Sequence, residues 1–226
     1  MIIEHIKQTE STNEYVKKFI KKRENALVRA DFQTAGKGTK GRSFISEEGG
    51  LYVSKLTFYQ NLLAQNAWSI MIDSAMAVVK TLLAYGIDAK IKWPNDIVVN
   101  GKKICGILIT NTFKGEFVDY SIVGIGINVN NQLHESISDI ATSVKQVIGR
   151  EIDLDNFFLT FMMNYSSCEK WEDYKKYNLV LGKKIKIIRG EETFEGVAKD
   201  ILPNGALLLE SGEILYAGEI NLKITV

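Results

Sequence analysis

The segment 92–108 constrains the fold of this 226-residue chain more than any other part. It contains a Lys-Trp-Pro-Asn-Asp corner, a short β-rich run, an Asn-Gly pair and a longer apolar run. Asn100-Gly101 between two β-rich runs predicts a hairpin, because both residues tolerate the positive φ that a type I′ turn requires. We therefore expect two antiparallel strands that meet at this turn.

A two-residue loop would also set the register of this hairpin. Val98 then faces Lys103 and Asp96 faces Cys105, and opposed residues share one face of a sheet. Asp96 and Lys103 become diagonal neighbours, roughly 7 Å apart at Cβ, a distance that a lysine side chain can span. The pair is either a surface ion pair or the charged end of a site, while Lys102 belongs to the opposite face.

The composition is that of an ordinary soluble globular protein, with 46% apolar and 24% charged residues and a net charge of +1. The charge argues against a large nucleic-acid interface. Two cysteines, Cys105 and Cys168, make no disulfide framework. The first residues do not resemble a signal peptide, and the apolar stretch 68–79 contains Asp73 and is shorter than the ~20 residues of a membrane span. We expect a cytoplasmic protein.

The segment 34–50 has five glycines and no periodicity. Its Gly36, Gly38 and Gly41 match Gly-x-Gly-x-x-Gly, but a dinucleotide-binding site needs a helix directly after the third glycine. Arg42-Ser43-Phe44 and then a strand follow instead, so this interpretation is rejected. A basic loop carrying Lys37, Lys40 and Arg42 is suited to closing over an anion, and a disordered surface loop is the alternative.

A strand predicted over 116–130 has an unusual face. Its apolar residues alternate with Gly124, Gly126, Asn128 and Asn130. Two glycines on one face of a strand often mark the close approach of a ligand or of another backbone. This face suits a planar ligand, unless a helix packs on it.

The other elements follow from their periodicity. Ser11 and Glu14 form a capping-box pattern that begins a helix running to about Lys22. We further expect strands over 2–7, 26–33 and 51–58, and helices over 65–85, 137–148 and 154–177. Five short strands are predicted over 183–188, 192–201, 206–210, 213–216 and 220–224. They would form a small antiparallel barrel packed on the main domain, so the predicted domains are 1–179 and 180–226.

Three separated segments together resemble the biotin protein ligases: the glycine loop 36–42, the corner 92–96 with 103–108, and the Gly-x-Gly-Ile-Asn strand 124–128. Shorter matches occur in the same order at Ser11-Thr12-Asn13, Gln33, Gly50-Leu51-Tyr52 and Gly218-Glu219-Ile220. The resemblance implies an α+β fold: a mixed, largely antiparallel sheet with helices on one side, as in class II synthetases, plus a small SH3-like C-terminal barrel. With only ten residues before Ser11, a monofunctional form without a DNA-binding domain is expected.

The resemblance also implies an activity. Such a ligase joins biotin to ATP as biotinyl-5′-AMP with release of pyrophosphate. It then transfers biotin to a lysine of a biotin carboxyl carrier protein, from acetyl-CoA carboxylase or a related carboxylase. ATP and Mg²⁺ are implied cofactors, with Mg²⁺ bound mainly through the ATP phosphates and not by a dedicated protein site. A homodimer is one implied assembly, and neither DNA nor a membrane is an expected partner.

The resemblance to the biotin protein ligases also implies roles for individual residues of this sequence. The catalytic residues implied are Lys103, Asp96 and Arg42. Those implied to bind biotin are Ser11, Thr12, Asn13, Gln33, Gly36, Lys37, Gly38, Thr39, Lys103, Gly106, Gly124 and Gly126. Those implied to bind ATP or the adenylate are Lys37, Arg42, Trp93, Asn95, Asp96 and Asn128.

Some positions depart from the family pattern. Lys37 and Thr39 stand where the loop has its first and second arginines, and Phe44 where it has tryptophan. Lysine lacks the guanidinium fork and threonine lacks the charge, so looser retention of the adenylate is expected. No aromatic residue between Val129 and Arg150 can stack on adenine. Two alternatives remain: a lipoate-type ligase with the same adenylate chemistry, or a non-catalytic ligand- or RNA-binding module.

Overall fold

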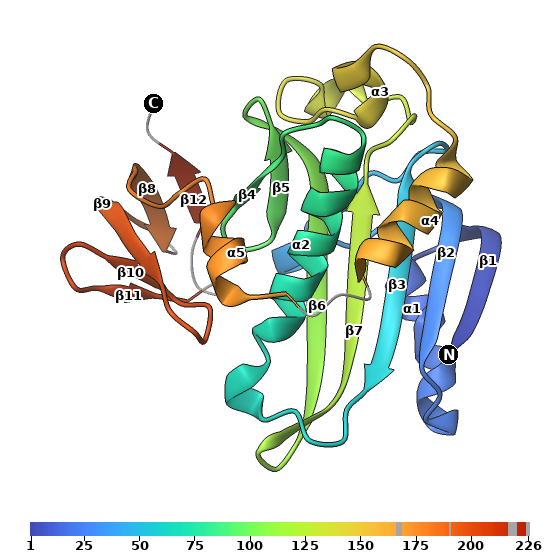
Figure 1. The fold of residues 1–226 in the computed structure, drawn as a ribbon, viewed down its shortest axis with the longest axis horizontal. Coiled ribbons are helices and arrows are strands. Elements are labelled where there is room, and N and C mark those ends of the chain that lie inside the picture. Colours follow the sequence, from blue (N-terminus) through green and yellow to red (C-terminus); the bar gives the residue numbers. More distant parts are fainter. Residues whose placement is uncertain (166–168, 190, 217–220, 225–226) are drawn as a thin grey trace.

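A computed structural model describes the whole chain except residues 166–168, 190, 217–220 and 225–226. Its main body is a seven-stranded sheet in the order β1-β2-β3-β7-β6-β5-β4. The first pair of strands is parallel and the other pairs are antiparallel. The strands are β1 (Ile2–Thr9), β2 (Ala26–Gln33), β3 (Leu51–Phe58), β4 (Lys90–Lys92), β5 (Asp96–Val99), β6 (Lys102–Lys114) and β7 (Phe117–Ile127). Figure 1 shows the sheet with helices packed across it.

The long helices cover one face of this sheet. Helix α2 (Ser69–Ala84) lies along it beside α4 (Leu154–Tyr165) and α5 (Trp171–Lys176), and the large apolar core fills the layer between. The short α1 (Thr12–Tyr15) and the 3₁₀ helix η1 (Val16–Lys22) pack on the opposite face, over a second, smaller core cluster. The expectation of helices on one side therefore holds for the long helices, and the first helix is the exception.

The central helix, predicted over 65–85, is confirmed as α2 over Ser69–Ala84. With the short η3 (Ala64–Asn66) it makes a helical segment 64–84 that has the length and mean hydropathy of a membrane span. The reason for its apolar character is its place in the fold, since 61% of the most apolar window is buried against the sheet and its neighbours. It ends as predicted at Gly86, which has a φ of +76°.

The predicted hairpin forms, with one correction to its register. Asn100 and Gly101 have φ values of 49° and 77°, and Val98 pairs with Lys103 as expected. An irregularity then shifts the ladder by one residue, so Asp96 pairs with Gly106 and not with Cys105. The shift follows from the extra residue of a β-bulge in β6. It places the Cys105 thiol in the apolar core, where burial raises its pKa.

Three helix predictions were wrong in detail. The segment 137–148 is not one helix but η4 (Glu135–Ile137) and α3 (Val144–Ile148), because Ile140–Thr142 run extended along Lys103. The segment 154–177 is split into α4 and α5, with extended backbone at Lys170. Ser11 occupies the N-cap of α1, but no side-chain cap bond forms there, so the capping box is absent. Cys168 lies outside the described residues.

The C-terminal part forms the predicted small antiparallel β structure. Its strands are β8 (Lys184–Arg189), β9 (Glu192–Ile201), β10 (Leu207–Leu209), β11 (Ile214–Leu215) and β12 (Asn221–Ile224), in the order β11-β10-β9-β8-β12. Among the described residues, no ladder joins β11 to β12 to close a barrel. The Gly218-Glu219-Ile220 match lies outside the described residues.

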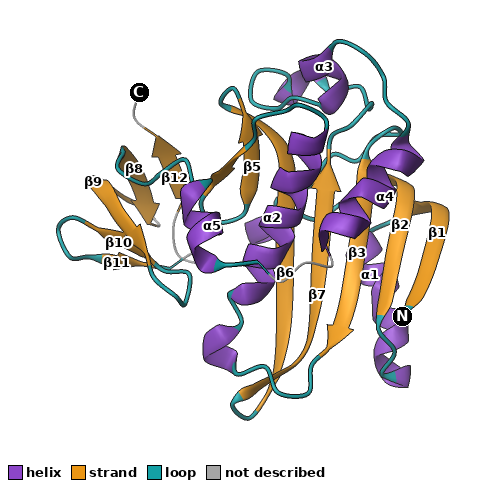
Figure 2. Ribbon diagram, viewed as in Figure 1, coloured by secondary structure: helices purple, strands orange, loops and turns teal. Residues whose placement is uncertain are grey.

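This small sheet packs on the main body, as expected (Figure 2). Its buried side chains belong to the same core cluster as those of α2 and the large sheet. The turn at Gly205 lies against Trp68 at the start of α2, and its carbonyl oxygen accepts a hydrogen bond of 2.9 Å from Trp93 Nε1. The turn therefore joins the C-terminal part directly to the Trp-Pro-Asn-Asp corner.

Candidate active site

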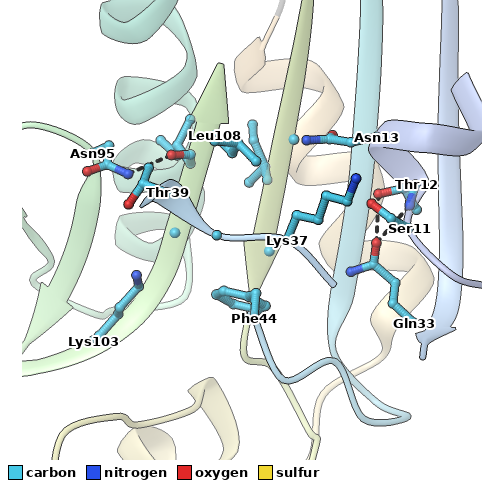
Figure 3. Close-up of a pocket in the computed structure, with 16 residues that line it drawn as sticks. Ser11, Thr12, Asn13, Gln33, Lys37, Thr39, Phe44, Asn95, Lys103 and Leu108 are labelled. Atoms are coloured by element: carbon cyan, nitrogen blue, oxygen red, sulfur yellow. Dashed lines mark hydrogen bonds between the residues drawn. The ribbon is translucent and has the colours of Figure 1, made fainter. Parts of the chain in front are cut away.

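A small pocket lies on the sheet face that carries α1, between α1 and the glycine-rich loop (Figure 3). It brings together residues from segments far apart in the sequence. Its lining includes most of the residues implied to bind biotin: Ser11, Thr12, Asn13, Gln33, Lys37, Gly38, Thr39, Lys103, Gly106, Gly124 and Gly126. The same pocket is lined by Phe44, Asn95, Ile107, Leu108 and Ile125.

Hydrogen bonds arrange the polar wall of this pocket. Gln33 Oε1 accepts from the backbone N–H of Thr12 at 2.8 Å and from its hydroxyl at 3.0 Å. Gln33 Nε2 donates to Ser46 Oγ at 2.8 Å. The fully buried Ser54 hydroxyl lies 2.7 Å from Thr12 Oγ1 and 2.5 Å from Asn13 Oδ1. This network holds the donors and acceptors of the wall in fixed orientations.

Ser54 and Ser46 were missed in the sequence. Ser54 pairs with Gly124 across the β3–β7 ladder, so it lies on the glycine face. The available signal was a small polar residue between two apolar residues of the same strand face, Tyr52 and Leu56. Nothing in the sequence pointed to Ser46, because its partner Gln33 is reached only after the loop folds back.

The glycine face forms the floor of the pocket. A side chain at Gly124 would collide with the carboxamide of Asn13, and one at Gly126 would come within 2.6 Å of the Phe44 ring. A Cβ at Gly106 would lie 3.0 Å from Lys103 Nζ and 3.2 Å from Phe44. The bare backbone therefore admits two side chains from the walls. One of them, Asn13, belongs to the short helix α1, so the alternative that a helix packs on this face is met in part, at Gly124.

The remaining space is small. The cavity between floor, wall and Phe44 is about 40 Å³, which is room for a few water molecules. The ring of Phe44 covers the glycine face, since a Cβ at Gly126 would come within 2.6 Å of it, so a planar ligand on this face would displace the ring.

The loop over this pocket is folded as a hairpin in the structure. We call residues 34–46 the flap. Within it, the Gly38 N–H donates to Arg42 O at 2.6 Å and the Phe44 N–H donates to Gly36 O at 2.8 Å, as in a narrow hairpin. Gly36 is required by this geometry, since a Cβ there would collide with the carbonyl of Phe44. Gly36 thus supports the flap and does not line the pocket.

The ion pair proposed from the hairpin forms despite the shifted register. Lys103 Nζ lies 2.6 Å from Asp96 Oδ1, with side-chain exposures of 36% and 29%. Both residues face a wide groove that continues from the pocket. The pair therefore lies half-buried at the wall of this groove, and its role at a site stays a prediction.

The groove is large enough for a nucleotide, with a volume of about 1580 Å³. Its lining includes five residues implied to bind the adenylate: Arg42, Trp93, Asn95, Asp96 and Asn128. The sixth, Lys37, lines the small pocket. Lys40, Lys92 and Lys103 add positive charge along the groove, and Asp139 adds a further carboxylate.

Three of these residues already bind other parts of the chain. Trp93 is 1% exposed and donates to Gly205 O, so its role is to anchor the corner. Asn95 Nδ2 donates to Ile107 O at 2.7 Å. Asn128 is buried, donates to Thr142 O at 3.1 Å and accepts from Asn131. These residues shape the groove through the backbone segments that they hold.

Two isoleucines on the groove wall were missed. Ile137 and Ile140 line the groove, and the Ile140 side chain is exposed. The Ile140 carbonyl accepts from the Lys103 N–H at 2.8 Å, which fixes this segment beside the ion pair. Aliphatic side chains thus occupy the region where an aromatic residue was expected to be lacking.

A metal centre built by the protein alone is not seen in the described part of the chain. No group of three or more His, Cys, Asp or Glu side chains lies close enough together there to hold an ion. The site instead consists of a closed polar pocket and an adjoining basic groove. A small polar pocket thus opens into a groove of nucleotide size, with the Lys103–Asp96 pair beside both.

Comparison with known proteins identifies the family. Residues 5–128 match the biotin/lipoate A/B protein ligase family, and residues 180–223 match the biotin protein ligase C-terminal domain. The chain belongs to the biotin/lipoate A/B protein ligase family. The bifunctional ligase/repressor BirA of Bacillus subtilis is 36% identical over 219 residues, which are 88% of this chain and 66% of that protein. The chain thus spans about two thirds of that relative's length.

Two further relatives resemble nearly the whole chain. The biotin–[acetyl-CoA-carboxylase] ligase of Mycobacterium tuberculosis is 24% identical over 215 residues, covering 87% of this chain and 79% of that protein. The structure of the biotin protein ligase from Aquifex aeolicus in complex with biotin and ATP has a TM-score of 0.77. It is 28% identical and covers 99% of both chains.

Proposed function

We propose that this protein is an ATP-dependent biotin protein ligase, with a catalytic domain over 1–179 and a small domain over 180–226. It activates biotin as biotinyl-5′-AMP and then transfers it to a lysine of a biotin carboxyl carrier protein, which forms a carbon–nitrogen bond. The single observation that carries the proposal is the meeting of the polar pocket with the groove at Lys103, which lines both. A carboxylate held in the pocket would reach the groove at that point.

The pocket suits the neutral head group of biotin. A ureido ring needs fixed donors and acceptors, because each polar atom left unpaired on burial costs ~1–3 kcal/mol. Ser11, Thr12 and Gln33 offer these groups, and Ser54 orients Thr12 and Asn13 from below. Gly106, Gly124 and Gly126 let the flat ring approach the sheet once Phe44 has moved aside.

In the first half-reaction the biotin carboxylate attacks the α-phosphorus of ATP, and pyrophosphate leaves. Two anions must meet in line, so the site has to neutralise charge and fix their orientation. Lys103 and Arg42 supply positive charge from the two sides of the groove. Asp96 and Asp139 are the carboxylates available there, so a Mg²⁺ ion would be held mainly by the phosphate oxygens, where it adds further neutralisation.

In the second half-reaction a lysine amine of the carrier protein attacks the mixed anhydride. The amine must lose a proton to become a nucleophile, and AMP leaves with the former carboxyl oxygen bound to phosphorus. We assign Asp96 to orient this amine and accept its proton. Its place at the open groove, beside Lys103, allows an incoming side chain to reach it.

The adenine would rest on aliphatic surface. Ile140 and Ile137 present exposed apolar area beside the groove, on a segment whose backbone is bonded to Lys103. Asn128 would then affect nucleotide binding indirectly, because its side chain donates a hydrogen bond to the Thr142 carbonyl and so positions this segment. A homodimer, the absence of a DNA-binding function and a cytoplasmic location stay predictions.

The test is biotin-dependent exchange of labelled pyrophosphate into ATP, with lipoate as the parallel substrate. Exchange with biotin and not with lipoate supports the proposal. Exchange with lipoate alone would instead assign a lipoate-type ligase, which the match of 180–223 to a biotin protein ligase domain disfavours. No exchange with either would leave the non-catalytic binding module.

A further inference from the structure

We propose that Glu14 is a positioning residue for this reaction, whose carboxylate holds Lys37 and thereby keeps the flap closed over the pocket. The inference rests on the proposed function, because the pocket beneath the flap is the one assigned to biotin. Glu14 itself lies outside the motifs that the family resemblance covers.

The contact spans the pocket from one wall to the other. Lys37 Nζ lies 2.6 Å from Glu14 Oε1. Lys37 belongs to the flap and lines the pocket, and Figure 3 shows its side chain extending across the pocket toward the Thr12–Asn13 side. Glu14 belongs to α1, which supplies that wall. A ligand on the glycine face would therefore lie behind this ion pair.

A second lysine, Lys17, also contacts the carboxylate of Glu14 and orients it. Lys17 Nζ lies 2.7 Å from Glu14 Oε2, one helical turn away in the same segment. The hydrogen bonds from Lys17 and then from Lys37 hold the pKa of Glu14 below its ordinary value. Because Lys17 lies on η1, which directly follows α1 and is not part of the flap, it can hold the carboxylate whether or not the flap is closed. When the flap closes, Lys37 therefore meets a carboxylate that Lys17 already holds in position.

The base of the flap is held separately by backbone hydrogen bonds. The Thr34 and Ala35 N–H groups donate to Thr9 O and Glu10 O at 3.0 and 2.9 Å, and the Gln33 N–H donates to Ser46 O at 3.1 Å. These bonds fix the ends of the flap but not the hairpin between them. Beyond the base, the contact of Lys37 with α1 and the Phe44 ring on the floor restrain the hairpin over the pocket.

The contribution of the Glu14–Lys37 pair to flap closure can be judged from the exposure of the two side chains. The Lys37 and Glu14 side chains are 52% and 39% exposed, so the pair belongs with exposed ion pairs. Removing such a pair changes an equilibrium by roughly two- to five-fold. Salt screens it, and at ~1 M ionic strength the Debye length of about 3 Å leaves little of the attraction.

The experiment compares Glu14→Gln with Glu4→Gln, a matched control. Glu4 makes a similar exposed pair with Lys18, 2.8 Å apart, on the outer side of η1. The first readout is the rate at which trypsin cleaves the ligand-free flap after Lys40 and Arg42. The second is the dissociation rate of biotin at low and at ~1 M salt. We expect Glu14→Gln to raise both rates roughly two- to five-fold at low salt and Glu4→Gln to change neither.

A double variant separates the contact from other effects of Lys37. If the two residues act only through their pair, Glu14→Gln with Lys37→Met releases biotin as fast as Lys37→Met alone. Cleavage and dissociation at the wild-type rates in Glu14→Gln, or additive effects in the double variant, would overturn the inference. Failure of the wild type to bind biotin would refute the proposed function instead, while the cleavage comparison still tests the Glu14 contact.

Discussion

Replacing Asp96 with asparagine should affect the two half-reactions in opposite directions. The carboxylate lies 2.6 Å from Lys103 Nζ, and both side chains are roughly one-third exposed. The attraction is then about 0.2–1 kcal/mol, as for exposed pairs, and not the several kcal/mol of a buried pair. Asparagine keeps the shape but releases Lys103 for the phosphate, so formation of the adenylate should stay constant or rise by up to about five-fold.

The transfer step should fall steeply in the same variant. A positioned proton acceptor contributes typically about 10²–10⁴-fold to a rate, and an amide cannot accept the proton. The first step is measured by pyrophosphate exchange. The second is measured in a single turnover, from the isolated enzyme–adenylate complex to the carrier protein.

The control is Asp88→Asn, which removes the exposed Asp88–Lys90 pair of the same length, 2.6 Å, at the start of the edge strand β4 next to β5. It should leave both steps unchanged. If Asp96→Asn transfers biotin at the wild-type rate, Asp96 is not the proton acceptor. If it slows only adenylate formation, the carboxylate serves to hold Lys103 and the assignment is wrong.

Three further predictions concern the flap, the hairpin and the C-terminal turn. Thr39→Arg should slow release of the adenylate about 10-fold or more, since a hydrogen bond to a charged group contributes about 1.5–3 kcal/mol; an unchanged release rate measured with trapped product would contradict this. Lys103→Met should lower pyrophosphate exchange about 100-fold or more, while Lys102→Met, which loses only an exposed bond to Ser138 O, should stay within about two-fold. Gly205→Ala should lower the free energy of unfolding in urea by about 2–4 kcal/mol, because its φ is +84° and a Cβ would collide with Trp68. Gly212→Ala, with a φ of +88° but open space around it, should cost about 1 kcal/mol, and equal losses would show that the Trp68 contact is unimportant.

Local signals in the sequence predicted most of the parts of this site. The Asn-Gly turn, the alternating glycines of β7 and the basic glycine loop are each set by residues adjacent in the chain, and all three occur in the structure. The register was wrong by one beyond Lys103 because a bulge leaves little trace in an apolar run. The helix predicted over 137–148 failed for a different reason: its middle pairs with the backbone of Lys103, a partner far away in sequence.

The residues missed at the site share one property, which is that their partners lie on other elements. Ser54 meets Thr12 and Asn13 only when β3 packs under α1, and Ser46 meets Gln33 only when the flap folds back. Periodicity places a side chain on a face but does not say what will cover that face. The family resemblance supplied positions for ligand contacts, yet it assigned Trp93 and Asn128 to the nucleotide, although the structure shows them bonded to the protein.

The two ion pairs at the site have a similar arrangement. A lysine lies at each end of the path from pocket to groove, and each is held by a carboxylate on a neighbouring element: Lys37 by Glu14 and Lys103 by Asp96. Both pairs are partly exposed, but they serve different steps. Lys103 can exchange Asp96 for a phosphate oxygen at a cost of about 1 kcal/mol or less, whereas Lys37 keeps Glu14 while the flap is closed over the ligand. On this argument the departures at Lys37 and Thr39 weaken the grip on the adenylate but leave its formation to Lys103, and the two variants Glu14→Gln and Asp96→Asn separate the two ends.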